Sequence, residues 1–409
     1  MRLNFYYLII PFMINSSCQS ENNQAKQTET EKLEEGTFAY DVNFLKAKDS
    51  IIILKNNAGN GQLIVSPAYQ AKVFTSTADG PGGKSFGWIN YKAFEVKEPD
   101  PHMNAYGGED RLWLGPEGGK FSIYFKPGTE MVFENWHTPK AIDTESWNLI
   151  TATDKKVSMS KEMNLLNYAG TTLQCTVERD VQVLENEEIE QRLGINLSEN
   201  IKAVGFLTKN SIANTGEQEW NQQTGAPCLW NLDMFSPSPK TVIVIPYKNN
   251  ADGKVATTDY FGEIPKDRIA YKNSVLLFKA DGQSRGKLGI PPVRAKTIAG
   301  SFDATNNVLT ITLFDVKESE IYLNQEWTTE KNPFKGDAVN AYNDGPLADG
   351  TQMGPFYEIE SVSPAAFLKP GEKLLHQHSV FHFIGDKAML DSIAQKTLGI
   401  SLNEIEAAF

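Results

Sequence analysis

Residues 356–383 read FYEIESVSPAAFLKPGEKLLHQHSVFHF, and this stretch decides the fold. Apolar and polar residues alternate along Phe356–Ser361 and along Leu374–Phe383, which predicts two strands that each bury one face. The run Leu368–Glu372 between them contains Pro-Gly and is typical of a tight turn. The C-terminal part of the chain is therefore expected to form a β-sheet.

The same strand pattern recurs over most of the chain, and only two helices interrupt it. One helix is predicted over Ala39–Ala47 and another over Asp386–Leu398, with Asp386 as N-cap and Gly399 beyond its end. Many strands at short spacing with few helices predict an all-β fold, an antiparallel sandwich or barrel. The further predicted strands are Ile51–Leu54, Gly61–Val65, Phe121–Phe125, Thr171–Leu184 paired with Ile189–Leu197 as a hairpin, Val204–Lys209, Val242–Ile245, Ser274–Lys279 and Val308–Phe314.

The first residues carry the pattern of an export signal. Leu3–Ile14 is a short apolar run, and Asn15-Ser16-Ser17 precedes Cys18, which predicts a lipoprotein signal peptide over residues 1–17 and lipidation of Cys18. The apolar run is too short to span a bilayer as a helix. Residues 18–36 are polar and predict a disordered tether, followed by one domain over residues 37–409. The alternative is an ordinary signal peptide with an incidental cysteine.

These features predict a protein of the bacterial cell envelope, held by its lipid anchor alone on the periplasmic or surface face of the outer membrane. The net charge is −12 and no basic cluster stands out, which argues against nucleic acid as a partner. No phosphate-binding loop, nucleophile elbow or zinc motif occurs, so no cofactor and no metal are predicted. Cys175 and Cys228 are expected to be free, buried thiols, although an oxidising envelope would permit a disulfide.

Residues 104–119, NAYGGEDRLWLGPEGG, form the first candidate site. Glycines hold Glu109, Arg111 and Trp113 in turns, and charged groups beside an aromatic ring suit the hydroxyls and C–H edges of a sugar. Trp136 and His137 lie in a second candidate loop. The alternative is that both segments are structural, with Glu109 and Arg111 satisfying each other.

The C-terminal strands form the third candidate site. Glu358 and Glu360 are two residues apart and therefore share one face of a strand. His376, His378 and His382 also share a strand face. Histidines beside carboxylates could serve as general acid and base, or could hold a divalent metal, although their spacing matches no known zinc motif. The alternative is that these histidines are hydrogen-bonded within a polar sheet face.

The segments quoted above resemble a family of uncharacterised lipoproteins from Bacteroidota. The resemblance covers most of the chain after the tether. Its motifs are Gly107–Gly119, Ala141–Glu145, Glu358–Ser361 and Leu368–Glu372.

More remotely, the chain resembles the galactose-mutarotase-like superfamily of aldose 1-epimerases. This resemblance implies an antiparallel β-supersandwich with a sugar site on a concave sheet face, and it makes Glu358 the counterpart of the general base. Asn214-Thr215-Gly216 and Leu229–Leu232 look like the segments around the epimerase's catalytic histidine, whose position falls at or near Pro227. Opening a sugar ring needs an acid as well as a base, so the epimerase reaction is in doubt unless His137, His376 or His378 supplies the proton.

The leading hypothesis is an envelope lipoprotein that binds or modifies a mono- or oligosaccharide through a concave sheet face. Its expected site contains Arg111, Trp113, Trp136, Trp230, Glu358 and the pair His376 and His378. One alternative is a sugar epimerase or lyase-like enzyme with Glu358 as base, and another is a non-catalytic lipoprotein that binds a protein.

Overall fold

A ten-stranded and a five-stranded antiparallel sheet face each other in the computed structural model, which describes Met1 and residues 33–409. Glu34–Phe409 form one unit. Cys18 and nearly all of the predicted signal peptide and tether lie outside the described residues. Within the described part of the chain, no helix is long and apolar enough to cross a membrane.

The strands fall into three sheets, and each sheet is antiparallel throughout. In spatial order, the ten-stranded sheet contains β11 (Ile269–Lys272), β12 (Val275–Lys279), β10 (Thr241–Pro246), β14 (Ile298–Asp303), β15 (Val308–Phe314), β18 (Lys373–Ile384), β8 (Lys202–Asn214), β7 (Thr172–Val183), β6 (Lys156–Leu166) and β5 (Asn148–Ala152). The five-stranded sheet contains β13 (Gly286–Ile290), β16 (Val339–Asn343), β17 (Tyr357–Val362), β9 (Cys228–Phe235) and β4 (Arg111–Gly115). The small third sheet contains β1 (Ile52–Lys55), β2 (Gln62–Ser66) and β3 (Lys72–Thr77).

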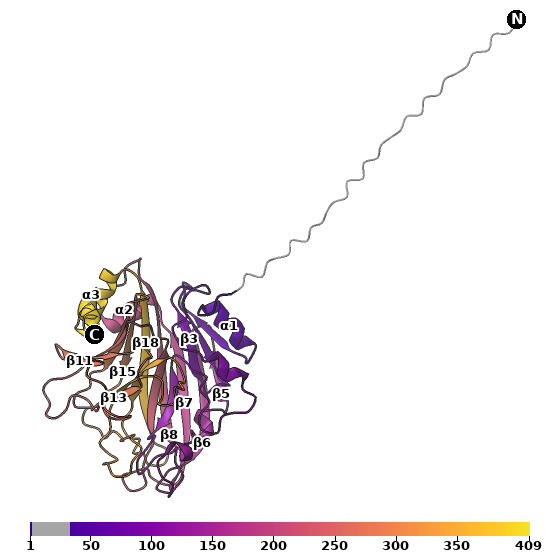
Figure 1. Ribbon diagram of the computed structural model, residues 1–409. Helices are drawn as coiled ribbons and strands as arrows, with labels where there is room; N and C mark the ends of the chain where they lie inside the picture. Colours follow the sequence, from indigo (N-terminus) through magenta and orange to yellow (C-terminus); the bar gives the residue numbers. More distant parts are fainter. Residues whose placement is uncertain (2–32) are drawn as a thin grey trace. The chain divides into compact units, whose positions relative to one another are not determined.

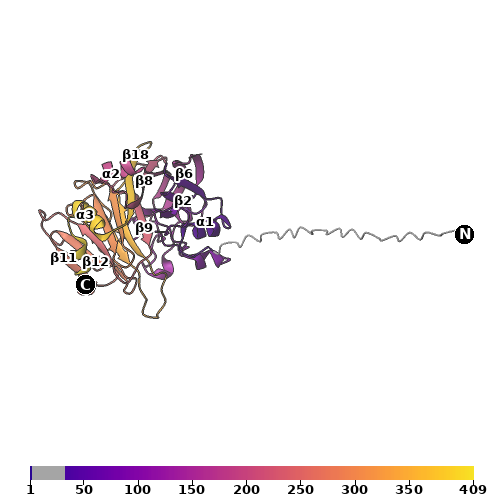
Figure 2. The same cartoon turned by 90° about the horizontal axis from the view of Figure 1, so that it is seen from above.

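Helices cover the small sheet and the outer face of the ten-stranded sheet. The helix α1 (Phe38–Lys46) packs against the three-stranded sheet, while α2 (Asn186–Leu193), α3 (Lys387–Leu398) and α4 (Leu402–Glu406) cover the outer face of the ten-stranded sheet. Figures 1 and 2 show α1 and α3 at opposite ends of the domain. Single 3-10 turns lie at Tyr91–Glu95, Phe133–Asn135 and Lys140–Ile142.

Strand β18 shows how side-chain alternation separates two cores. Phe381 and Phe383 point outward and pack with the helices. His376, His378 and His382 point inward, toward the five-stranded sheet. Successive residues of a strand face opposite sides, so one strand serves an apolar layer and a polar layer at once.

The predicted all-β antiparallel fold with a C-terminal helix is confirmed. The predicted hairpin strand Ile189–Leu197 is wrong, because residues Asn186–Leu193 form α2. A capping box joins Glu185 and Glu188 at the N-terminus of α2, and Gly194 ends the helix in the left-handed conformation at φ 64°. These two capping interactions explain why the segment is helical. The predicted strand Phe121–Phe125 is also wrong, because this buried segment is an irregular chain of bends.

Candidate functional site

The two faces of the five-stranded sheet differ in what they contact. Asp233 and Ser361 point toward the ten-stranded sheet, where both accept or share hydrogen bonds with His378. Arg111, Trp230 and Glu358 lie on the opposite face and line a cleft of about 380 Å³. Because side chains alternate along a strand, the open face of this sheet forms the floor of the cleft.

A second hollow of about 560 Å³ adjoins the first and shares part of its lining. Each volume lies within the range of roughly 300–1,000 Å³ that is typical of small-molecule sites. The shared residues include Glu117, Arg285, Lys287, Trp327 and Tyr342. The two hollows therefore form one elongated cleft with two lobes.

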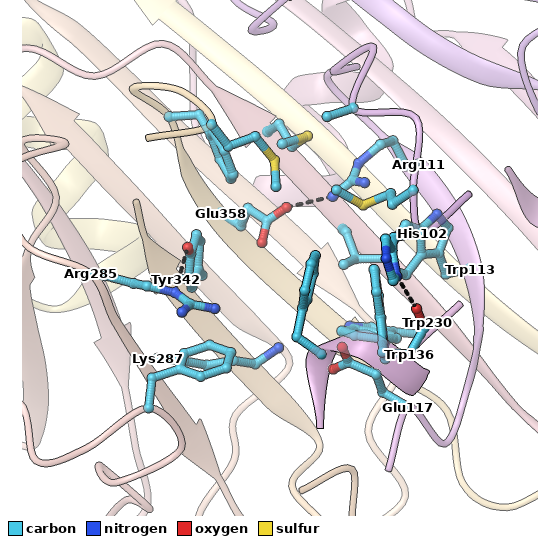
Figure 3. Close-up of a pocket in the computed structure, with 18 of the residues that line it drawn as sticks. His102, Arg111, Trp113, Glu117, Trp136, Trp230, Arg285, Lys287, Tyr342 and Glu358 are labelled. Atoms are coloured by element: carbon cyan, nitrogen blue, oxygen red, sulfur yellow. Dashed lines mark hydrogen bonds and ion pairs between the residues drawn. The ribbon is translucent and has the colours of Figure 1, made fainter. Parts of the chain in front are cut away.

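A buried ion pair lies at the first lobe. Arg111 on β4 and Glu358 on β17 reach over β9 from either side, and Arg111 Nη2 lies 2.5 Å from Glu358 Oε1 (Figure 3). Burial raises the pKa of Glu358 to about 7, the charge of Arg111 opposes this rise, and nearby Glu360 adds to it. Glu358 is therefore a buried carboxyl group whose charge depends on its pairing with Arg111.

A second polar group lies beneath the middle of the cleft. Glu360 is fully buried, and its Oε2 accepts hydrogen bonds from Trp230 Nε1 at 2.8 Å and from Lys287 Nζ at 3.0 Å. Burial alone would lower the pKa of Lys287, but the carboxylates of Glu360, Glu117 and Glu358 raise it above its usual value. Lys287 is therefore a charged side chain fixed in position.

Aromatic rings form the walls. Trp113 meets Trp230 edge to face at 5.8 Å, and the Arg111 guanidinium lies 5.1 Å from the centre of the Trp113 ring. Trp136 stacks on Trp327 at a centroid distance of 5.8 Å and an angle of 23°. These rings and the ion pair give the cleft apolar walls and a charged floor.

Apolar side chains also surround the mouth of the cleft. Phe133, Phe261, Leu347 and Met353 are each at least 40% exposed although they are large and apolar. Each belongs to a connection between strands. Exposed apolar residues gathered around a cavity are typical of a ligand-binding surface.

His102 lines the first lobe and was not predicted as a site residue. Its Nδ1 lies 2.6 Å from the carbonyl oxygen of Trp136, and its ring stacks on His137 at 4.7 Å. A carbonyl can only accept a hydrogen bond, so Nδ1 carries the proton in the neutral ring. The remaining nitrogen, Nε2, is then an acceptor.

Glu117 lines both lobes and is, after Glu358, a second carboxyl group of the cleft. It was not predicted as a site residue. It is half-buried, and burial raises its pKa while the charge of Lys287 opposes the rise. The neighbouring Gly118 allows a close approach, since a Cβ atom there would lie 2.2 Å from the carbonyl oxygen of Glu326. This contact brings the loops that carry Glu117 and Trp327 together.

The structure gathers some of the predicted site residues in the cleft and excludes others. Those that line it are Arg111, Trp113, Trp136, Trp230 and Glu358. Glu358 and Glu360 share one face of their strand, as predicted, but Glu360 lies beneath Trp230. His137 lies behind His102 and bonds the carbonyl oxygen of Pro101 at 2.8 Å.

Glu109 does not pair with Arg111, and that alternative is wrong. Glu109 is fully buried, and its Oε1 accepts from Ser76 at 2.6 Å and lies 3.0 Å from His382 Nε2. Glu109 and Arg111 are two residues apart, but the chain enters β4 between them, after two glycines at φ 82° and 129°. The turn sends Glu109 into the interior and Arg111 into the cleft.

His376 and His378 are also absent from the cleft. Both are fully buried between the two sheets, where each ring lies 2.9 Å from Ser361 Oγ, and His378 Nε2 lies 2.8 Å from Asp233. The expected convergence of these histidines with Arg111 and Glu358 is therefore wrong, because the five-stranded sheet separates them.

Two further sequence expectations concern cysteines and metal ligands. Cys175 and Cys228 are buried and unpaired in the structure, as predicted. Among residues 33–409, no group of three His, Cys, Asp or Glu side chains is placed to hold a metal ion.

Comparison with known proteins gives a family and several structural likenesses. A model of a family of unknown function (DUF6786) matches residues 36–409, and no curated protein matches the sequence significantly. Slr1438 protein from Synechocystis is 13% identical, with a TM-score of 0.49, over 83% of this chain and 96% of its own.

Two structures from lactobacilli are similar in the same way. A galactose mutarotase-like protein from Lactobacillus casei is 10% identical, with a TM-score of 0.47, over 81% of this chain and 100% of its own. A galactose mutarotase related enzyme from Lactobacillus acidophilus is 9% identical, with a TM-score of 0.45, over 81% of this chain and 97% of its own. These are likenesses of fold, and what the cleft can bind follows from its own residues.

Proposed function

The chain belongs to a family of unknown function, DUF6786, and we propose that its two-lobed cleft binds a saccharide. A sugar presents hydroxyl groups at its edges and C–H groups on its faces. The hydroxyls need directional charged partners, which Arg111 and Glu358 offer, and the C–H faces need aromatic surfaces. The juxtaposition of that ion pair with the rings of Trp113 and Trp230 is the observation that carries the proposal.

The two lobes favour an oligosaccharide over a single sugar. The exposed rings of Phe133 and Phe261 extend the apolar surface beyond the ion pair. A chain of two or more sugar units would use the floor residues of one lobe and the mouth residues of both.

We also propose that the protein is a lipoprotein of the bacterial cell envelope, anchored through Cys18 on the outer membrane. The support is the order of a short apolar run, small residues, Cys18 and a polar segment. A lipid anchor of this kind would hold the cleft close to glycan fragments in the envelope.

A second candidate function is a sugar epimerase or lyase-like enzyme with Glu358 as general base. The observation in its favour is that Glu358, Glu117 and His102 line the same cleft, with burial raising the pKa of both carboxyl groups. The third candidate is a lipoprotein that binds another protein. An aromatic patch without converging charged groups would favour it, but in this cleft charged groups converge below the aromatic rings.

Calorimetry of the full chain against a panel of neutral and acidic oligosaccharides tests the proposal. We expect at least one member of the panel to bind, and Arg111→Ala to abolish that binding. If no saccharide in a broad panel binds, the carbohydrate proposal fails and the protein-binding candidate takes its place.

A further inference from the structure

The cleft contains one cationic side chain whose charge is not neutralised. Three cationic residues line its two lobes, namely Arg111, Arg285 and Lys287. Arg111 is paired with Glu358, and Lys287 is paired with Glu360. Arg285 forms no ion pair with any described residue.

The position of Arg285 is nevertheless well defined. It precedes β13 and is two residues from Lys287, so both side chains share the open face of the sheet. Its Nε donates to Tyr342 Oη at 3.2 Å (Figure 3). Its guanidinium lies 4.0 Å from the centre of the Phe261 ring. Arg285 is exposed, and the hydrogen bond to Tyr342 together with the attraction to the Phe261 ring favours this orientation of its guanidinium.

The free edge of this guanidinium is suited to an anion. The Nε atom of Arg285 donates its hydrogen bond to Tyr342 Oη. Neither Nη atom of Arg285 has a hydrogen-bond acceptor among the described residues. Two terminal nitrogens of an arginine form a planar fork that matches the two oxygens of a carboxylate.

Nearby acidic groups do not fill this role. Asp344 lies at the same end of the cleft, but it accepts hydrogen bonds from Tyr342 Oη at 3.1 Å and from the Gly354 amide at 2.8 Å. Glu326 is paired with Lys331. Glu117 lines both lobes and interacts electrostatically with Arg285, but it forms no ion pair with it among the described residues. The charge of Arg285 is therefore available to a ligand even though the whole chain carries a net charge of −12.

We infer that the saccharide bound in this cleft is acidic and that Arg285 receives its anionic group. This inference rests on the proposed function and names the class of sugar. The stacked Phe261 ring and the Tyr342 hydroxyl orient the guanidinium, while the first lobe holds a neighbouring sugar unit over Arg111 and Glu358. The anion is a carboxylate on a sugar acid or a phosphate on a sugar ester, since both match the same fork.

Matched ligand pairs test the inference. Oligosaccharides of galacturonic, glucuronic and mannuronic acid are compared by calorimetry with their carboxyl-reduced forms, which differ only by replacing each carboxylate with a CH₂OH group. Hexose 6-phosphates are compared with the corresponding hexoses. We expect the acidic member of one pair to bind the full chain about tenfold more tightly, since charge-assisted hydrogen bonds exceed neutral ones and Arg285 is partly screened by water.

Arg285→Ala should remove that preference, so that the acidic and neutral members of the pair bind the variant with equal affinity. Arg192→Ala is the matched control, because Arg192 is an exposed arginine on α2, outside both lobes. It changes the net charge equally and should keep the preference. A stronger preference in the phosphate pair than in the carboxylate pairs would identify phosphate as the anion.

Two results would overturn the inference while the proposed function stands. One is equal binding of the acidic and neutral members of every pair. The other is a preference for the acidic member that persists in Arg285→Ala. If no acidic or neutral member binds at all, the proposed function itself fails together with the inference.

Discussion

Glu358 and His378 lie on opposite sides of the five-stranded sheet. Glu358 projects from β17 into the cleft beside Arg111, whereas His378 on β18 contacts Asp233 and Ser361 from the other side of that sheet. A sheet of hydrogen-bonded strands admits no proton transfer between side chains that it separates. The acid that sugar-ring opening requires therefore has to come from the cleft itself.

The first prediction is that the full chain does not appreciably accelerate the interconversion of galactose or glucose anomers. The sequence resemblance implies that the acid's position falls at or near Pro227, which has no proton to transfer. His102 is the one histidine that lines the cleft among the described residues, and its Nδ1 already bonds the Trp136 carbonyl. Loss of one member of an acid–base pair typically costs about 10²–10⁴-fold in rate. Polarimetry on fresh α-galactose measures this. Fast mutarotation that both Glu358→Gln and His102→Ala abolish would contradict the prediction. It would support the candidate function of a sugar epimerase with Glu358 as general base.

The second prediction concerns Glu358 as a binding residue. Glu358→Gln should weaken saccharide binding by roughly tenfold, because a hydrogen bond to a charged group contributes about 1.5–3 kcal/mol and one to a neutral group about 0.5–1.5 kcal/mol. Glu109→Gln is the matched control, since Glu109 is also a buried glutamate but bonds Ser76 and His382 away from the cleft. Calorimetry should show unchanged affinity for the control. Equal losses in both variants would point to a general loss of structure.

The third prediction concerns the ion pair between Arg179 and Asp110, which is fully buried. Arg179 also donates to the Ala71 carbonyl at 2.9 Å and to Asn210 at 2.8 Å. Arg179→Met should lower the free energy of unfolding by about 3–5 kcal/mol, because it leaves Asp110 buried without a counter-charge. Lys202→Met breaks an exposed pair with Asp79 and should cost about 0–1 kcal/mol. Urea denaturation measures both, and similar losses would refute the assignment.

The fourth prediction is a pH dependence of stability that depends on His376. Burial, followed by the charge of nearby His378, lowers the pKa of His376 from 6.5 to about 3. The unfolded chain therefore binds a proton at His376 that the folded chain rejects. This contribution to stability is complete above pH 6.5 and is lost as the pH falls toward 3.

Its size should be a few kcal/mol, at about 1.4 kcal/mol per pKa unit. His376→Gln removes the titrating group and retains a polar atom for Ser361. Urea unfolding of both proteins between pH 7 and pH 4 should show a shallower decline in the variant. Parallel declines would show that His376 is not responsible.

The fifth prediction is that Cys18 carries the lipid. Cys18→Ser should move the protein from the membrane fraction to the soluble fraction, because a single serine hydroxyl cannot accept the diacylglycerol that a thiol carries. Labelled palmitate should enter the wild-type protein and not the variant. If the wild-type protein takes up no label, the anchor is disproved.

The fold could be predicted largely because β17, β18 and α3 have regular patterns in the sequence. Helix α2 was missed because its glutamates suggested a turn between strands. Its capping box and Gly194, the signals that mark the two ends of the helix, were not recognised in the sequence. Arg111 and Trp113 could be predicted because they stand out in a glycine-rich segment. Glu358 could be predicted because it shares one strand face with Glu360. His376 and His378 were misplaced because alternation gives the shared face of residues but not the direction in which that face points.

Lys287 and Arg285 were missed for a different reason. They flank Gly286, the first residue of the short strand β13, whose sequence has no recognisable motif. Only the register that pairs Lys287 with Tyr342 on β16 brings this strand to the cleft. The rule that residues two apart share a strand face would have grouped them, had that strand been predicted. His102 lies in an irregular loop, where no periodic signal exists.

The alternation within β9 and β17 also constrains how such a protein can diverge. A one-residue insertion in either strand would exchange the cleft side chains with those that bond His378, and would place Trp230 and Glu358 in the interior. The connections that carry Phe133, Phe261, Trp327 and Met353 have no such restriction and can change length while the strands remain. Ligand preference among descendants should therefore change through loop substitutions and insertions, with the strand residues inherited as a block.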